Sequence, residues 1–235
     1  MTYYVPRGGH PGQEELTTDR AVFTDAYAVL PRGTMRDIVV SHWPHWRGTR
    51  GWILARPLTG FAETFSWYVV EVAPGGGSDR PEPDPDAEAV LFVVDGTLRL
   101  TIGGIDHVLG AGGYAFLPPG TGWTAANGSP DGAAGATTTF HWIRKAYERV
   151  DGIEVPEPFV THEADVAGVE MPGTDGAWRT QRFVGIDDVR HDMQVNIVTF
   201  EPGASIPFPE THVMEHGLYV IEGKGMYLLN RDWVE

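Results

Sequence analysis

Short apolar runs bounded by glycine and proline recur along the chain. Four of them read "SWYVVEV", "AVLFVVDG", "MQVNIVTF" and "GLYVIEG", and each is rich in the branched and aromatic residues that favour β-strands. The 3.6-residue period of an amphipathic helix is weak throughout. The pattern therefore predicts an all-β protein with frequent turns, and the 30 glycines and 18 prolines agree with this prediction.

The two halves of the chain resemble each other. "APGGGSDRPEPDPDAEAVLFVVDGTLRL", from Ala73, and "EPGASIPFPETHVMEHGLYVIEGKGMYL", from Glu201, both carry Pro-Gly at their second and third positions. Each continues through a loop into an apolar strand, which ends at Gly96 in the first copy and at Gly223 in the second. A repeat of this length indicates two similar β domains in tandem, connected by the charged and proline-bearing stretch "RKAYERVDGIEVPEPF".

The composition narrows the classes of function. A formal net charge of −15 disfavours a nucleic-acid partner, because phosphate binding needs a basic face. The sequence contains no cysteine, which excludes disulfides, thiolate metal sites and cysteine nucleophiles. It shows neither the pattern of a signal peptide at its start nor an apolar run of the roughly 18 residues that span a membrane. We therefore expect a cytoplasmic protein with no membrane partner.

The stretch "PETHVMEHG" in the second half holds the candidate metal ligands Glu210, His212 and His216. Side chains alternate between the faces of a strand, so these three would project together into a barrel if the strand is continuous. One carboxylate and two neutral imidazoles suit divalent manganese, iron, cobalt, nickel or zinc, and three protein ligands leave room for water or substrate. Glu215 has the opposite parity, and we expect it to face solvent or an interface.

Two other interpretations use the same letters. "HVMEH" also matches the H-x-x-E-H helix of certain metalloproteases. Pro207 and Pro209 before the motif, and the strand-forming "GLYVIEG" after it, disfavour a helix there. Alternatively, the two histidines are ordinary buried or surface residues. Three ligand-type side chains at a shared spacing favour the metal site over that alternative.

The repeat resembles the cupin superfamily, whose fold is a double-sheet jelly roll. In "GGYAFLPPGTGWTAAN" the residues at the spacing of the second cupin motif are Gly112, Pro118, Gly120 and Asn127. Trp123 stands where that motif has its histidine. The ligand positions of the first motif hold, in this half, Pro83, Pro85 and Ala89. The resemblance thus implies tandem cupin (double-stranded β-helix or jelly-roll) domains, of which only the second keeps metal ligands.

The expected domain organisation follows from this resemblance. Residues 1–145 would form an N-terminal arm and a metal-free cupin, residues 146–160 a connector, and residues 161–235 a metal-binding cupin. The second half contains no second cupin motif, so we expect its barrel to be incomplete at the C-terminus, with the last strands missing from this chain.

The two-domain form with "ETHVMEHG" resembles the (S)-ureidoglycine aminohydrolases of allantoin breakdown. The matching stretches include "LTTDRAVFTDAYAVLPRGTMRDIVV", "EAVLFVVDGTLRLTIGG" and "DMQVNIVTFEPGASIPFPETHVMEHGLYVIEGKGMYLLNRDW". The resemblance implies a homo-oligomer that hydrolyses a small molecule, (S)-ureidoglycine, to (S)-ureidoglycolate and ammonia with Mn²⁺ held by Glu210, His212 and His216.

The same resemblance implies catalytic roles for Glu210 and for Tyr227, which matches a family tyrosine near the substrate. Alternation along "GMYLL" does not show which face of that strand lines the site, so a plain core tyrosine is an equal alternative. A glutamine ligand and a functional lysine of the family would follow "NRDW", beyond Glu235. Two other functions stay open: a different metal cupin, such as an iron-dependent oxygenase, and a non-catalytic cupin that binds a small ligand.

Overall fold

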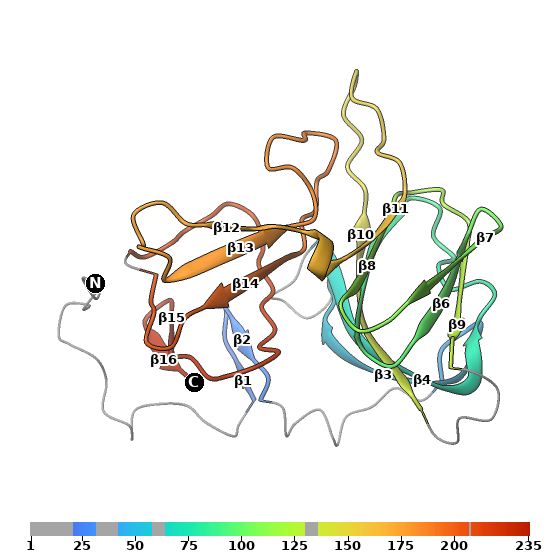
Figure 1. Ribbon diagram of the computed structural model, residues 1–235, viewed down its shortest axis with the longest axis horizontal. Helices are drawn as coiled ribbons and strands as arrows, with labels where there is room; N and C mark the ends of the chain where they lie inside the picture. The colour runs from blue at the N-terminus through green and yellow to red at the C-terminus, as the bar shows by residue number, and fades with distance from the viewer. Residues whose placement is uncertain (1–20, 32–41, 58–63, 130–135, 207) are drawn as a thin grey trace.

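The computed structural model describes residues 21–31, 42–57, 64–129, 136–206 and 208–235. Within these ranges the regular structure consists of β-strands and short 3-10 turns, without an α-helix, which confirms the all-β prediction. Figure 1 shows two lobes: a large curled sheet formed by the first half of the chain, and smaller sheets formed mainly by the second half.

Nine strands form the large sheet, which curls into a nearly closed barrel (Figure 1). All the paired strands in it run antiparallel. The strands are β3 (Trp46–Ala55), β4 (Phe65–Ser78), β5 (Ala87–Asp95), β6 (Leu98–Ile102), β7 (Ile105–Leu109), β8 (Gly113–Leu117), β9 (Trp123–Asn127), β10 (Thr138–Ala146) and β11 (Phe159–His162).

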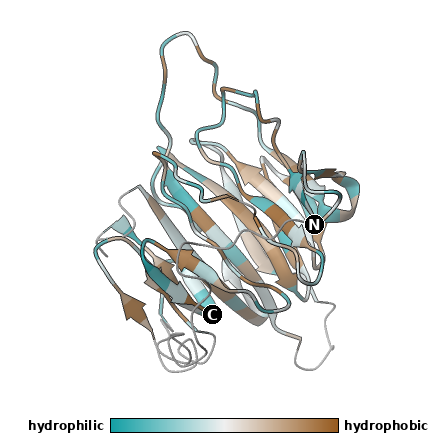
Figure 2. Ribbon diagram, turned by 90° about the vertical axis from the view of Figure 1, so that its left-hand side faces the viewer, coloured by the Kyte–Doolittle hydropathy of each residue, from teal (hydrophilic) through white to brown (hydrophobic). Residues whose placement is uncertain are grey.

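Strand β5 shows why this sheet forms. Six of the seven residues in its buried run are apolar, and they occupy both faces, as expected of a strand covered on both sides; Glu88 is the exception. Leu91 and Val93 point into the barrel, where they pack with Trp123 and other aromatic residues. Val90 and Phe92 point outward into a second apolar cluster. Figure 2 shows hydrophobic colour on many strands of the molecule, with hydrophilic stretches between.

Residues of the predicted second cupin motif close the turns of this barrel. Gly112 and Gly120 have positive φ angles of 83° and 77°, which glycine adopts without strain. The side chain of Asn127 donates hydrogen bonds to the backbone oxygens of Val72 (2.8 Å) and Ala136 (2.9 Å), tying β9 to two neighbouring segments. Trp123, at the position of the motif's histidine, is buried in the barrel core.

The second half forms two small sheets. A three-stranded antiparallel sheet contains β12 (Gly168–Glu170), β13 (Trp178–Arg182) and β14 (Asn196–Phe200), and a hairpin contains β15 (Tyr227–Leu229) and β16 (Asp232–Val234). Strand β11 pairs with β8 of the first barrel, so the boundary expected at residue 161 falls inside a strand of the large sheet. A 3-10 turn, Glu163–Asp165, follows β11 directly.

The second half packs against the outer face of the large sheet. Tyr114 and Phe116 of β8 are fully buried there, together with Val90 and Phe92 of β5. Phe183 stacks on Tyr114 with ring centroids 4.0 Å apart and planes nearly parallel. Stacked aromatic rings add stabilisation beyond the area that they bury. The two lobes are therefore joined by an aromatic seam.

The N-terminal segment reaches the second lobe. A short hairpin of β1 (Val22–Phe23) and β2 (Ala28–Val29) lies beside the C-terminal hairpin in Figure 1, and Tyr27 Oη donates a 2.7 Å hydrogen bond to Asp232 Oδ2. The rest of the arm predicted from the sequence, residues 1–20 and 32–41, lies outside the described residues.

One group of strand predictions is wrong. "GLYVIEG", residues 217–223, was expected to form a strand, and Glu210 to His216 were expected to share a continuous one, but residues 208–226 contain no strand. A strand needs a neighbour to hydrogen-bond with, and the described residues provide none beside this segment. The prediction rested on the apolar pattern alone, whereas a strand also requires a partner strand.

Candidate functional site

The predicted ligands lie on the surface of the second lobe. Glu210, His212 and His216 are all exposed, so they do not line the interior of a barrel as the sequence had suggested. The structure does bring the two imidazoles together: the rings of His212 and His216 stack with centroids 4.6 Å apart and planes inclined by 29°. Glu210 lies two residues before this pair along the chain.

The side-chain types of Glu210, His212 and His216 suit a divalent first-row metal, but their arrangement in the structure does not yet form a three-ligand site. Two imidazoles beside each other, with a carboxylate nearby in sequence, match the ligand types that manganese, iron and zinc accept. Among the described residues, however, no group of three histidine, cysteine, aspartate or glutamate side chains is arranged to hold a metal ion. The histidine pair is thus assembled, whereas the carboxylate of Glu210 is not brought to it.

Glu215, expected to face solvent or an interface, is half-buried, unlike the exposed pair. Its Oε2 accepts hydrogen bonds from the backbone N–H (3.0 Å) and the hydroxyl (2.7 Å) of Thr64, the residue directly before β4. The interface that Glu215 serves is therefore the first barrel of the same chain. This contact joins residues 151 positions apart, and the sequence offered no signal for Thr64 as the partner.

Tyr227 begins the hairpin strand β15 and is half-buried. Burial raises the pKa of its phenol, so the group stays protonated at neutral pH and can donate a hydrogen bond. Within the described part of the chain, no ring contact or hydrogen bond joins Tyr227 to Glu210, His212 or His216. Its predicted catalytic role stays a prediction.

The helical interpretation of "HVMEH" fails. Residues 212–216 contain no helix, so the H-x-x-E-H geometry of the metalloproteases is absent from this segment. The prolines before the motif and the strand-forming residues after it had disfavoured a helix, and this expectation is confirmed. The alternative in which His212 and His216 are ordinary surface residues agrees with their exposure, and their mutual stacking is what favours a joint role.

Sequence reasoning missed a buried ionisable group between the lobes. Glu88, on the outer face of β5, is fully buried, and this burial, together with the adjacent Asp192 carboxylate, raises its pKa to about 9. Asp192 accepts hydrogen bonds from Lys145 Nζ (2.6 Å) and from the backbone N–H of Glu148 (2.8 Å). Glu88 directly precedes the apolar run "AVLFVV", and alternation along that run would have marked it as facing the second lobe.

A second missed group is His141, on the outer face of β10. It is 4% exposed, and burial lowers its pKa to about 4, so the imidazole is neutral at neutral pH. Its Nδ1 accepts a 3.0 Å hydrogen bond from Trp67 Nε1, which places the ring proton on Nε2. Its ring lies edge-on to that of Tyr219, 4.3 Å away, in the segment that carries the histidine pair.

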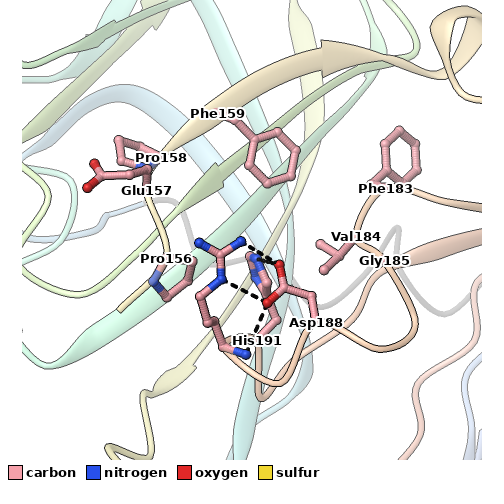
Figure 3. Close-up of a pocket in the computed structure, with 10 residues that line it drawn as sticks. Pro156, Glu157, Pro158, Phe159, Phe183, Val184, Gly185, Asp188 and His191 are labelled. Atoms are coloured by element: carbon pink, nitrogen blue, oxygen red, sulfur yellow. Dashed lines mark hydrogen bonds and ion pairs between the residues drawn. The ribbon is translucent and has the colours of Figure 1, made fainter. Parts of the chain in front are cut away.

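A hollow of about 290 Å³ opens at the seam between β11 and the loop after β13 (Figure 3). Its charged groups largely neutralise one another: the Arg190 guanidinium binds the Asp188 carboxylate through two nitrogens and lowers the pKa of Asp188 to about 2. The hollow contains none of the predicted ligands. The residues that line it are Pro156, Glu157, Pro158, Phe159, Phe183, Val184, Gly185, Asp188, Arg190 and His191.

Comparison with known proteins gives one family. The model of the cupin domain family (Cupin_2) matches residues 68–137, within the first barrel. The (S)-ureidoglycine aminohydrolase of Escherichia coli is 27% identical over 94% of this chain and 80% of its own length. The enzyme of the same name from Arabidopsis thaliana is 28% identical over 91% of this chain, which spans 66% of that enzyme.

Two solved structures share the whole architecture. The crystal structure of a Pseudomonas aeruginosa protein described as glyoxylate-induced is 60% identical, with a TM-score of 0.84 over 100% of this chain and 84% of that one. The structure of the Escherichia coli protein Ylba is 26% identical, with a TM-score of 0.77 over 95% of this chain and 84% of that one. No helix in the described part of the chain is long and apolar enough to cross a membrane.

Proposed function

Because the chain belongs to the (S)-ureidoglycine aminohydrolase family of cupins, we propose that it hydrolyses (S)-ureidoglycine to (S)-ureidoglycolate and ammonia with a divalent metal, Mn²⁺ in the first instance. The observation that carries the proposal is the His212–His216 pair within "ETHVMEHG", the stretch that most specifically resembles the family. The reaction replaces the carbon–nitrogen bond to the amine by a carbon–oxygen bond from water.

The residues that would hold the metal are His212, His216 and Glu210. A bound divalent ion supplies two kinds of chemistry: it orients a chelating polar substrate, and it lowers the pKa of a bound water. The imidazoles are offered side by side on the surface, where a small carboxylate-bearing substrate has access to them. Glu210 lies two residues before His212 and would be the third ligand.

Tyr227 is the proposed second catalytic residue, together with Glu210. Its phenol is protonated at neutral pH, so it can donate a hydrogen bond to a substrate oxygen but cannot accept a proton there. Tyr227→Phe removes that donor and keeps the ring. We expect this substitution to lower kcat/KM while leaving metal content unchanged, and a change in metal content would assign the tyrosine to the ligand set instead.

Ammonia release from (S)-ureidoglycine, corrected for the enzyme-free rate, tests the activity directly. Wild type with Mn²⁺ should release ammonia without consuming oxygen, His212→Ala should fall to the enzyme-free rate, and His107→Ala, on β7 of the first barrel, should remain active. Oxygen consumption in place of ammonia release would indicate an oxygenase. Substrate binding without turnover would indicate a binding protein, and either result would overturn the proposal.

A series of metals separates the two roles of the ion. If the rate of ammonia release changes with the acidity of water bound to each metal, the ion activates water. If the rate does not depend on which metal is bound, the ion only orients the substrate. We also propose a cytoplasmic protein, as the sequence led us to expect, and a homo-oligomer, as the family resemblance implies; light scattering of the purified chain measures the stoichiometry.

A further inference from the structure

The segment that follows the histidine pair alternates between two environments. From residue 214 to residue 220, Glu215 and Tyr219 are half-buried, whereas Met214, Leu218 and Val220 are 64%, 63% and 49% exposed. Gly217 lies between the two half-buried residues, on the same side. One face of this segment therefore rests on the first barrel, and the other, which carries His216, faces outward.

Three residues of the first barrel receive the inner face. Thr64 donates two hydrogen bonds to Glu215, as described above. The indole of Trp67 lies so close to Gly217 that a Cβ on this glycine would be 2.5 Å from Trp67 Cζ3. Tyr219 packs edge-on against His141 at 4.3 Å and lies 6.3 Å from the Trp67 ring.

Two of the three receiving residues, Trp67 and His141, are held in place by the large sheet and by each other. Trp67 and His141 lie on the neighbouring strands β4 and β10, which pair in the middle of the large sheet. The 3.0 Å hydrogen bond from the indole N–H to His141 Nδ1 fixes both rings relative to each other. A segment without strand pairing of its own is thus set against a surface whose side chains have little freedom to move.

We propose that Thr64, Trp67 and His141 form a docking platform on the metal-free barrel that positions the His212–His216 pair for its metal. The platform contacts Glu215, which directly precedes His216, and Gly217, which directly follows it, so the direction of the His216 side chain depends on them. The proposal rests on the proposed function, because it assigns the platform to the site of the bound metal. In this proposal the platform residues are not ligands of the metal; they would act on it only through the segment.

Gly217→Ala is the sharpest perturbation. The added methyl meets the Trp67 indole at a distance that real Cβ contacts do not show, so the segment or the ring must shift. Because the indole N–H is bonded to His141, we expect the segment to lift from the platform. Gly122→Ala in the first barrel is the matched control, because its Cβ meets nothing within 4 Å. Trp67→Leu in the Gly217→Ala background removes the colliding ring atoms and should restore docking in part.

Two readouts are needed, one of which does not involve a metal. In the metal-free protein, nuclear Overhauser contacts between the His141 and Tyr219 rings report docking directly. We expect these contacts in wild type and Gly122→Ala, their loss in Gly217→Ala, and their partial return in the double variant. Manganese affinity, followed by the EPR signal of free Mn²⁺, should be about tenfold weaker in Gly217→Ala, in line with the effect of other residues that orient metal ligands.

The outcomes separate the platform from the proposed function. Ring contacts that persist in Gly217→Ala would overturn the platform, as would unchanged Mn²⁺ affinity after their loss. If wild type itself binds no Mn²⁺ while the ring contacts respond as expected, the docking stands, and the metal site of the proposed function, together with the positioning role, is refuted.

Discussion

Replacing Glu88 by glutamine should remove a large part of the pH dependence of stability near neutrality. This carboxyl group is fully buried between the lobes, and its pKa is raised to about 9, first by burial and then by Asp192. The folded protein therefore keeps a proton on Glu88 at neutral pH. The unfolded chain, with the ordinary pKa of 4.5, has released it.

The sign follows from proton linkage. Between pH 4.5 and about 9 the Glu88 side chain holds one proton more in the folded state than in the unfolded state, so the contribution of Glu88 to the free energy of unfolding falls as the pH rises through this window. The slope is about 1.4 kcal/mol per pH unit, and the loss between about pH 5.5 and 7.5 is roughly 3 kcal/mol. Asp192, whose pKa is lowered, is ionised in both states across this range and adds nothing to the slope.

Urea unfolding at a series of pH values, at constant ionic strength, measures this loss. Glutamine is neutral at every pH, so Glu88→Gln lacks this loss. The difference between the unfolding free energies of the variant and of wild type should therefore shift by about 3 kcal/mol in favour of the variant between about pH 5.5 and 7.5. Glu222→Gln, an exposed carboxylate of the second half, controls for a change in net charge. Parallel profiles for wild type and Glu88→Gln would refute a buried, protonated Glu88.

Three further predictions concern the contacts that hold the two lobes and the first barrel. Phe183→Ala removes the ring stacked at 4.0 Å on β8 and should lower the unfolding free energy by about 2 kcal/mol in urea; an unchanged midpoint would show that the aromatic seam contributes nothing. The pKa of His141 is lowered to about 4, so NMR of its ring should show a neutral imidazole down to about that pH, and a transition near its ordinary pKa would contradict its burial. Arg144→Met leaves the Glu82 carboxylate, whose side chain is 6% exposed, without its ion pair, and we expect the free energy of unfolding to fall by about 3 kcal/mol. Arg50→Met breaks the more exposed pair with Glu71 and should cost less than about 1 kcal/mol. Equal losses in the two variants would contradict the role of burial.

The first barrel could be predicted from the sequence because its local signals agree with one another. "AVLFVV" has the continuous apolar character of a strand buried on both faces, and β5 is such a strand. Gly112 and Gly120 of the second cupin motif take positive φ angles, and Asn127 Oδ1 accepts a local hydrogen bond from the backbone N–H of Ser129 (2.9 Å). Each of these features depends mainly on neighbours that are close in the sequence or on simple alternation.

The second half was harder to predict because its structure depends on distant partners. "GLYVIEG" has the composition of a strand, yet a strand exists only where another pairs with it, and the described residues offer no such neighbour. Parity left both solvent and an interface open for Glu215, and only the fold reveals Thr64 as its partner. The protonated Glu88 was equally hidden, because its pKa depends on burial and on Asp192, which approaches it only in three dimensions.

The most direct test of the account is the metal content of the purified chain, measured by native and inductively coupled plasma mass spectrometry for wild type and His212→Ala. The account predicts about one manganese ion per wild-type chain after loading with Mn²⁺, and its loss in the variant, since a site that keeps one imidazole and one carboxylate binds far more weakly. The same manganese content in both proteins would place the metal elsewhere, and its absence from both would contradict a metal site on residues 210–216.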